Sequence, residues 1–127
     1  MPRILIVDDE SGYRKHLRRL FSDSGYEVDT VGSAAEAFSL ASRHPPDGLI
    51  ADWMLKDDLS GLEIAKLLRA SNPSLKVIII SGYSSSELSE KARKFGISEF
   101  LEKPFSSTQI RDAVSRALET PQREHWQ

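Results

Sequence analysis

Residues 4–12 read ILIVDDESG, a short aliphatic run that gives way at once to acidic and small polar residues. Four consecutive aliphatic residues rich in β-branched side chains are typical of a strand that is buried on both faces, as in a parallel sheet. Residues 77–82 read VIIISG and repeat the pattern, with Ser81 and Gly82 after the aliphatic run. The two stretches therefore predict central strands of an α/β domain.

Amphipathic stretches separate the strand-like runs along the chain. Apolar residues at positions 13, 17, 20 and 21 lie on one face of a helix that ends near Ser24 and Gly25. Ser33 is predicted to cap a second helix, with Glu36 completing a capping box. Further helices are predicted around residues 62–68, 88–95 and 110–118, and further strands around 26–30, 49–51 and 100–101. Five strands alternating with five helices predict a parallel sheet with right-handed crossovers and helices on both faces.

The composition is that of one globular domain. A length of 127 residues, with 39% hydrophobic and 28% charged residues, is ordinary for such a domain. The net charge of −2 argues against a nucleic-acid-binding protein, and the lack of cysteine excludes disulfide scaffolds, zinc–thiolate sites and thiol nucleophiles. No apolar run approaches the roughly 20 residues of a membrane span, and no signal-peptide pattern is present. We expect one domain over residues 1–120, a tail or the start of a linker over 121–127, and a cytoplasmic location without membrane contact.

Chemically active side chains follow four of the predicted strands. Asp8 and Asp9 follow the first strand, Asp52 the third, Ser81 the fourth and Lys103 the fifth. Because the carboxyl ends of parallel strands meet at one edge of a sheet, and ligands bind there, we expect these side chains to share one crevice.

Three neighbouring carboxylates repel one another, so that one keeps a proton or a cation binds. An all-oxygen ligand set favours Mg²⁺ or Mn²⁺, and together with Lys103 it suits a phosphoryl group. Asp52 is then the candidate nucleophile that receives this group. Each residue also has a simpler interpretation: Asp8 and Asp9 as helix caps, Asp52 as the plain end of a strand, Ser81 as a turn residue and Lys103 as a surface lysine.

The ordered set of Asp8-Asp9, Asp52, Ser81 and Lys103-Pro104-Phe105 resembles the receiver domain of two-component response regulators, over about Arg3 to Leu118. The resemblance implies a flavodoxin-like fold, a single doubly wound sheet of five parallel strands in the order 2-1-3-4-5 with five helices. It also implies that Asp52 accepts a phosphoryl group from a phosphohistidine on a sensor histidine kinase or a histidine phosphotransfer protein. No turnover of an external substrate is expected.

The resemblance assigns further roles within the site. It implies Mg²⁺ held directly by Asp9, Asp52 and the backbone carbonyl of Met54, with Asp8 acting through bound water. Lys103 and Ser81 would contact the phosphoryl oxygens.

Ser81 and Phe100 would form a switch that changes the face made by the fourth helix, the fifth strand and the fifth helix. The Lys103–Pro104 bond would be cis.

The loop after Asp52 departs from the family pattern. Receivers commonly carry Met-Pro three and four residues after the phosphoacceptor and glycine eight after it, whereas here Leu55 and Lys56 stand in those places and Gly61 is nine residues after Asp52. Met54 and Tyr83 stand where a residue flanks the approach of water to the phosphoryl group. Both are large and neither is acidic or amide-bearing, so we expect slow loss of the phosphoryl group.

Other functions stay open on the sequence alone. They are a Mg²⁺-dependent phosphohydrolase, a flavodoxin-like nucleotide or flavin binder, and a degenerate receiver that acts as a phosphorylation-independent interaction module. A hydrolase normally carries a second aspartate where Met54 stands, and a flavodoxin-like binder carries a glycine-rich phosphate loop in place of Asp8-Asp9. The first helix carries Arg14, Lys15, Arg18 and Arg19 beside His16, which is either a solvated face or a docking surface for the phosphodonor. An effector domain or a downstream protein is a further possible partner.

Overall fold

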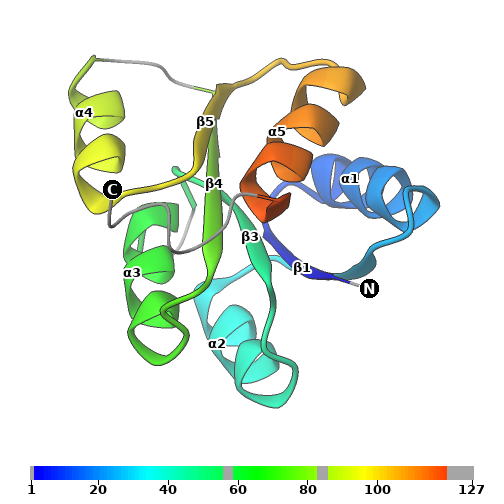
Figure 1. The fold of residues 1–127 in the computed structure, drawn as a ribbon, viewed down its shortest axis with the longest axis horizontal. Helices are drawn as coiled ribbons and strands as arrows, with labels where there is room; N and C mark the ends of the chain where they lie inside the picture. The colour runs from blue at the N-terminus through cyan, green and yellow to red at the C-terminus, as the bar shows by residue number, and fades with distance from the viewer. Residues whose placement is uncertain (1, 56–58, 83–85, 120–127) are drawn as a thin grey trace.

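The computed structural model describes residues 2–55, 59–82 and 86–119, and within them five strands and five helices alternate along the chain (Figure 1). The strands are β1 (Arg3–Val7), β2 (Glu27–Val31), β3 (Gly48–Asp52), β4 (Lys76–Ser81) and β5 (Glu99–Glu102). The helices are α1 (Ser11–Asp23), α2 (Ala34–Arg43), α3 (Gly61–Ser71), α4 (Ser86–Phe95) and α5 (Ser107–Glu119). All pairings are parallel and the order is β2-β1-β3-β4-β5, which confirms the predicted fold class and strand order. The predicted tail over 121–127 lies outside the described residues.

The sheet is covered by helices on both faces. One core cluster joins alternate residues of the central strands, such as Leu49 and Ile79, to α2, α3 and α4. The other joins the intervening residues, such as Ile50 and Ile78, to α1 and α5. Because successive strand side chains point to opposite faces, a strand between two helical layers must be apolar at every position. This explains the uninterrupted aliphatic runs, and Figure 1 shows α1 and α5 on one side of the sheet with α2, α3 and α4 on the other.

Hydrogen bonds of the sheet continue one residue past several strands. The backbone N–H of Asp8 donates to the carbonyl of Val31, that of Trp53 to Ile80, and that of Lys103 to Ser81, at 3.2, 2.8 and 2.7 Å. The residues that follow β1, β3 and β5 are thus held by the sheet itself. This edge is a rigid platform for their side chains.

The observed helix starts agree only partly with those predicted from the sequence. Ser33 caps α2 by accepting from the N–H of Glu36, but the Glu36 carboxylate accepts from the N–H of Gly32 and the Ser33 hydroxyl, so the predicted reciprocal box is incomplete. A complete capping box, which the sequence analysis missed, joins Ser60 and Glu63 at the start of α3. The cap residue of α1 is Glu10, without a side-chain cap bond, rather than Asp8 or Asp9. In the described part of the chain, no helix has the length and apolar character to cross a bilayer.

Candidate functional site

Three polar side chains are buried at the carboxyl edge of the sheet. Asp8, Asp52 and Ser81 are 0%, 4% and 0% exposed. Asp8 directly follows β1, and Asp52 and Ser81 are the last residues of the neighbouring strands β3 and β4. Asp52 is the last residue of β3, and its neighbour in the β4 register is Ile80. Burying carboxylates is costly unless a positive charge or hydrogen bonds compensate them, so their surroundings decide what the site can do.

The ammonium group of Lys103 forms ion pairs with three carboxylates. Lys103 Nζ lies 3.1 Å from Asp8 Oδ2, 2.8 Å from Glu10 Oε1 and 2.9 Å from Asp52 Oδ2. The side chain of Lys103 is 8% exposed, whereas that of Glu10 is 58% exposed. The structure therefore brings together Asp8, Asp52 and Lys103 as predicted, and adds Glu10. The Lys103–Pro104 peptide bond is cis, the isomer that the resemblance implies.

The electrostatics of the site shift the pKa values of Asp8 and Lys103. Burial raises the pKa of Asp8, and the Glu10 N–H and the Lys103 charge oppose that rise only in part. Burial alone would lower the pKa of Lys103, but hydrogen bonds to Glu10 and Asp52 and the charge of Asp8 outweigh it, so this pKa lies above its ordinary value. The carboxylates around Lys103 thus favour its charged form, and they outnumber it.

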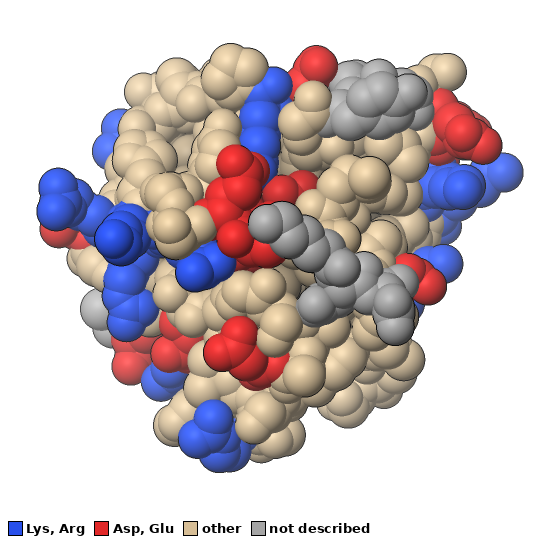
Figure 2. Space-filling view, turned by 180° about the vertical axis from the view of Figure 1, so that it is seen from behind, with Lys and Arg blue, Asp and Glu red and all other residues tan. Residues whose placement is uncertain are grey.

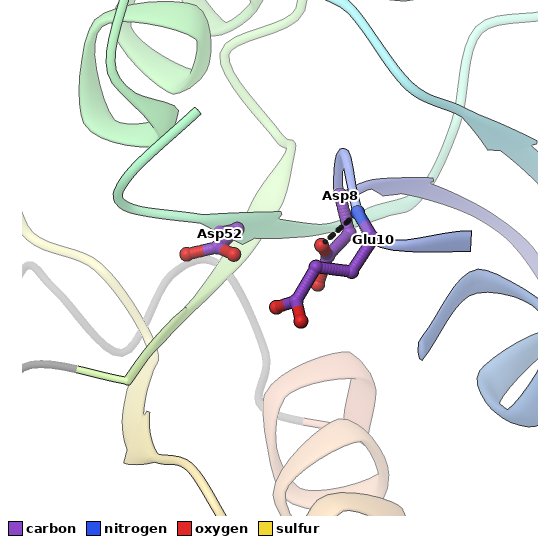
Figure 3. A group of neighbouring side chains, drawn as sticks. All are labelled: Asp8, Glu10 and Asp52. Atoms are coloured by element: carbon purple, nitrogen blue, oxygen red, sulfur yellow. Dashed lines mark hydrogen bonds between the residues drawn. The ribbon is translucent and has the colours of Figure 1, made fainter. Parts of the chain in front are cut away.

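The carboxylates have the composition of a hard-cation site. Oxygen atoms of Asp8, Glu10 and Asp52 lie within 4.8 Å of one another (Figure 3). Glu10 and Asp52, but not the fully buried Asp8, line a pocket of about 620 Å³, whose other lining residues are Asp9, Met54, Leu55, Gly82 and Lys103. Oxygen-only donors of this kind suit Mg²⁺ or Mn²⁺, and one ammonium leaves part of the negative charge uncompensated. The residues present therefore fit a divalent cation.

Asp9 was expected to be a direct ligand, and its place differs from that of its neighbours. It is half-buried and lines the pocket, but it lies outside the group formed by Asp8, Glu10 and Asp52. Glu10 is the residue that the sequence analysis missed. Because side chains alternate along an extended backbone, and Glu10 has φ −91° and ψ 112°, residues 8 and 10 turn to the same side. This two-residue spacing was the signal that could have revealed Glu10.

The structure describes three of the four remaining predicted site residues, Met54, Ser81 and Phe100. Met54 donates its N–H to Asp52 Oδ1 at 3.1 Å, and its side chain is exposed. The half-buried ring of Phe100 contacts Trp53, with centroids 6.4 Å apart. Ser81 is buried next to Lys103 in the hydrogen-bonded ladder. Tyr83 lies outside the described residues.

The basic side chains of α1 do not form one surface. Arg14 donates to the carbonyl of Asp8 at 2.6 Å and packs over Gly32, so it ties α1 to the end of β1. Lys15, Arg18 and Arg19 are exposed. On the face shown in Figure 2, acidic side chains gather near the centre with basic ones beside them. Arg14 therefore has a structural contact of its own, whereas the exposed basic residues of α1 are Lys15, Arg18 and Arg19.

Comparison with known proteins agrees with this site. Residues 4–115 match the family model for the response regulator receiver domain. The chain is 36% identical over 120 residues to the alginate biosynthesis transcriptional regulatory protein AlgB of Pseudomonas syringae pv. tomato, covering 94% of this chain and 27% of AlgB. It is 29% identical to sporulation initiation phosphotransferase F of Bacillus subtilis, covering 91% of this chain and 93% of that protein.

A solved structure shares both the fold and part of the sequence. The response regulator TrrA of Thermotoga maritima, crystallised in complex with Mg²⁺ and BeF, matches with a TM-score of 0.81 and 30% identity, over 93% of this chain and all of that chain. The chain spans only about a quarter of the length of AlgB, the curated relative described above. It belongs to the response regulator receiver domain family, whose members are phosphoacceptors of two-component signalling and not enzymes that turn over an external substrate.

Proposed function

We propose that Asp52 accepts the phosphoryl group, and that the donor is a phosphohistidine on a sensor histidine kinase or a histidine phosphotransfer protein. The observation that carries this assignment is the placement of the Asp52 carboxylate, which lines the open pocket while its Oδ2 lies 2.9 Å from Lys103 Nζ. Asp8 and Glu10 also contact Lys103, but Asp8 is fully buried, and the carboxylate of Glu10 is at the end of a largely exposed side chain. Of the three carboxylates that contact Lys103, only Asp52 combines a fixed position with access to the pocket.

The transfer is a displacement at phosphorus. A carboxylate oxygen of Asp52 forms the new P–O bond as the P–N bond of the phosphohistidine breaks, and the imidazole leaves. The N–H of Met54 holds Asp52 Oδ1 at 3.1 Å and so orients the carboxylate. Lys103 donates its N–H groups to the equatorial oxygens on which charge builds up.

The acidic group is the proposed place of a divalent cation. Asp8, Asp9, Glu10, Asp52 and the backbone carbonyl of Met54 are the candidate ligands, and Mg²⁺, with Mn²⁺ as a substitute, fits their oxygen atoms. When bound, such an ion neutralises charge on the phosphoryl oxygens. The Mg²⁺ in the TrrA complex supports the proposal.

The proposed output is a change in packing around Ser81 and Phe100. A phosphoryl group adds roughly two negative charges beside the buried Ser81 hydroxyl, which can turn to donate to it. The ring of Phe100 contacts Trp53, the residue next to Asp52. The aromatic pair therefore links the phosphoacceptor to the face formed by α4, β5 and α5, where a downstream protein or an effector domain would respond.

We also propose the cytoplasm as the setting and residues 1–120 as the domain.

The test is the intact mass of the protein after incubation with acetyl phosphate or phosphoramidate. We expect a gain of one phosphoryl group with Mg²⁺ and none with a chelator, because the acidic group needs a cation before it can accept an anion. Loss of the added mass in neutral hydroxylamine would identify an acyl phosphate. If neither donor adds mass in Mg²⁺, the chain is instead a degenerate receiver that acts as an interaction module.

Charge reversal on α1 is expected to slow phosphorylation by a protein donor but not by a small-molecule donor. In the variant Arg18→Glu/Arg19→Glu, transfer from the cognate phosphohistidine protein should slow by about tenfold, because two exposed attractions become repulsions. Phosphorylation by acetyl phosphate should stay at the wild-type rate. The matched control, Arg43→Glu/Lys66→Glu on α2 and α3, changes the net charge equally and should leave both rates unchanged. A parallel fall of both rates in the first variant would contradict a docking role.

The lifetime of the phosphoryl group is expected to depend on position 54. Met54→Asn should release phosphate about tenfold faster, because an amide at this exposed place can orient an attacking water molecule. Met54→Leu, which keeps an apolar side chain of similar size, is the control and should match the wild type. Release is followed by the decay of the added mass after the donor is removed. Tyr83→Glu tests the second position in the same way, and equal or slower decay in both variants would count against the idea.

A further inference from the structure

An aromatic ring is a fourth neighbour of the Lys103 ammonium. Nζ lies 4.0 Å from the ring centroid of Tyr13, a residue in the first turn of α1. The ring is half-buried and also packs against Phe105, with centroids 5.9 Å apart and planes tilted by 50°. Tyr13 thus contacts the side chains of both neighbours of Pro104, Lys103 and Phe105.

The other neighbours of Lys103 are all carboxylates, contributed by Asp8, Glu10 and Asp52. An ammonium group has three N–H donors, so these carboxylates occupy its whole donor capacity. When a phosphoryl group is attached to Asp52, those donors must turn toward the phosphoryl oxygens. The attraction between a cation and the face of a ring needs no particular N–H direction. Contact with Tyr13 is therefore compatible with either arrangement.

We propose that Tyr13 is a positioning residue for Lys103, which it holds at the mouth of the site both before and after transfer. The proposal rests on the proposed function of Asp52 and Lys103, and it deepens that function. Cation–π attraction is strongest where the cation is withdrawn from water, and the Lys103 side chain is 8% exposed. The tyrosine hydroxyl has no part in the proposal, so phenylalanine should replace tyrosine without loss.

The experiment compares Tyr13→Phe, which keeps the ring, with Tyr13→Leu, which keeps an apolar side chain without a ring. With phosphoramidate as the donor, the Phe variant should gain its phosphoryl group within twofold of the wild-type rate, and the Leu variant about tenfold more slowly. Each variant is also made in a Lys103→Met background. There the Leu substitution should cause no further slowing, because Tyr13 acts through Lys103. Slowing of equal size in both backgrounds, or a Leu variant as fast as the Phe variant, would overturn the proposal.

A second readout does not depend on phosphorylation. The ε-methylene protons of Lys103 should show an upfield ring-current shift in the proton NMR spectra of the wild type and the Phe variant, and should lose it in the Leu variant. If the wild type gains no phosphoryl group, the proposed function fails, and this shift alone decides whether Tyr13 holds Lys103. Unchanged Lys103 signals in the Leu variant would overturn the proposal in either case.

Discussion

The Asp52→Asn variant is expected to gain no phosphoryl group under conditions in which the wild type gains one. The amide has no anionic oxygen to attack phosphorus, and of the three carboxylates that contact Lys103 only Asp52 is both buried and part of the pocket lining. The loss should be complete with acetyl phosphate, with phosphoramidate and with a phosphohistidine protein. Intact mass measured in the presence of Mg²⁺ checks this result.

The same variant should keep its fold, because two effects on stability oppose each other. Removing one carboxylate relieves repulsion with the buried Asp8. However, the amide can accept from the Met54 N–H or from Lys103 but not from both, whereas the carboxylate serves both. We expect the free energy of unfolding to change by less than about 1 kcal/mol, well below the cost of breaking a buried ion pair.

A matched control makes the same chemical change elsewhere. Asp47→Asn lies just before β3, at the other end of that strand, and should be phosphorylated like the wild type. Phosphorylation of the Asp52→Asn variant would show that another side chain is the phosphoacceptor.

The Gly61→Ala variant is expected to lose about 3 kcal/mol of stability or more. Gly61 is the first residue of α3, and its N–H donates to the carbonyl of Trp53 at 3.1 Å. A β-carbon at position 61 would overlap the carbonyl oxygen of Asp52 and lie 2.8 Å from the carbonyl carbon. These are backbone atoms at the end of a central strand and cannot rotate away, so the strain should reach or exceed the usual range for overpacking, about 1–3 kcal/mol.

The substitution should also slow phosphorylation, since either α3 or the end of β3 must move. A displacement of about 1 Å in a reacting group can cost on the order of 10²-fold in rate. Urea unfolding followed by circular dichroism gives the stability, and the gain of mass with time gives the rate.

Gly12→Ala is the matched control for this glycine. A β-carbon at position 12 meets nothing within 4 Å, and the residue lies in α1, where alanine is favoured over glycine by up to about 1 kcal/mol. We expect this control to be at least as stable as the wild type. A Gly61→Ala variant of wild-type stability would show that the start of α3 yields readily to the added methyl group.

The contact at Gly61 also bears on the unusual loop after Asp52. The sequence shows one residue more than the family pattern between Asp52 and the glycine. In the structure Gly61 still packs directly on Asp52, and Leu55 and Leu59 pack against the core. The added length is therefore accommodated without separating α3 from the phosphoacceptor. Lys56, which stands where receivers commonly carry proline, lies outside the described residues.

The sequence by itself determined the class of fold and most of the acidic site. Aliphatic runs mark strands between two helical layers, and the parallel arrangement then brings the residues after the strands to one edge. Asp8, Asp52, Ser81 and Lys103 could be placed in this way because the main chain positions them. Hydrogen bonds of the sheet extend past the strand ends to Asp8, Trp53 and Lys103, so little depends on side-chain conformation.

Only the tertiary structure decided what surrounds these residues. Glu10, Tyr13 and Arg14 lie in or beside the first turn of α1, and the sequence pattern indicates an apolar position and two charged ones. The way α1 crosses the sheet turns Glu10 and Tyr13 onto Lys103 and draws Arg14 to the Asp8 carbonyl. Such contacts join residues up to 93 positions apart through flexible side chains. The alternation of residues 8 and 10 indicates the side to which Glu10 turns, but no local pattern indicates that it meets Lys103. Local pattern therefore specifies which residues reach the edge of the sheet, whereas helix packing specifies which of them touch.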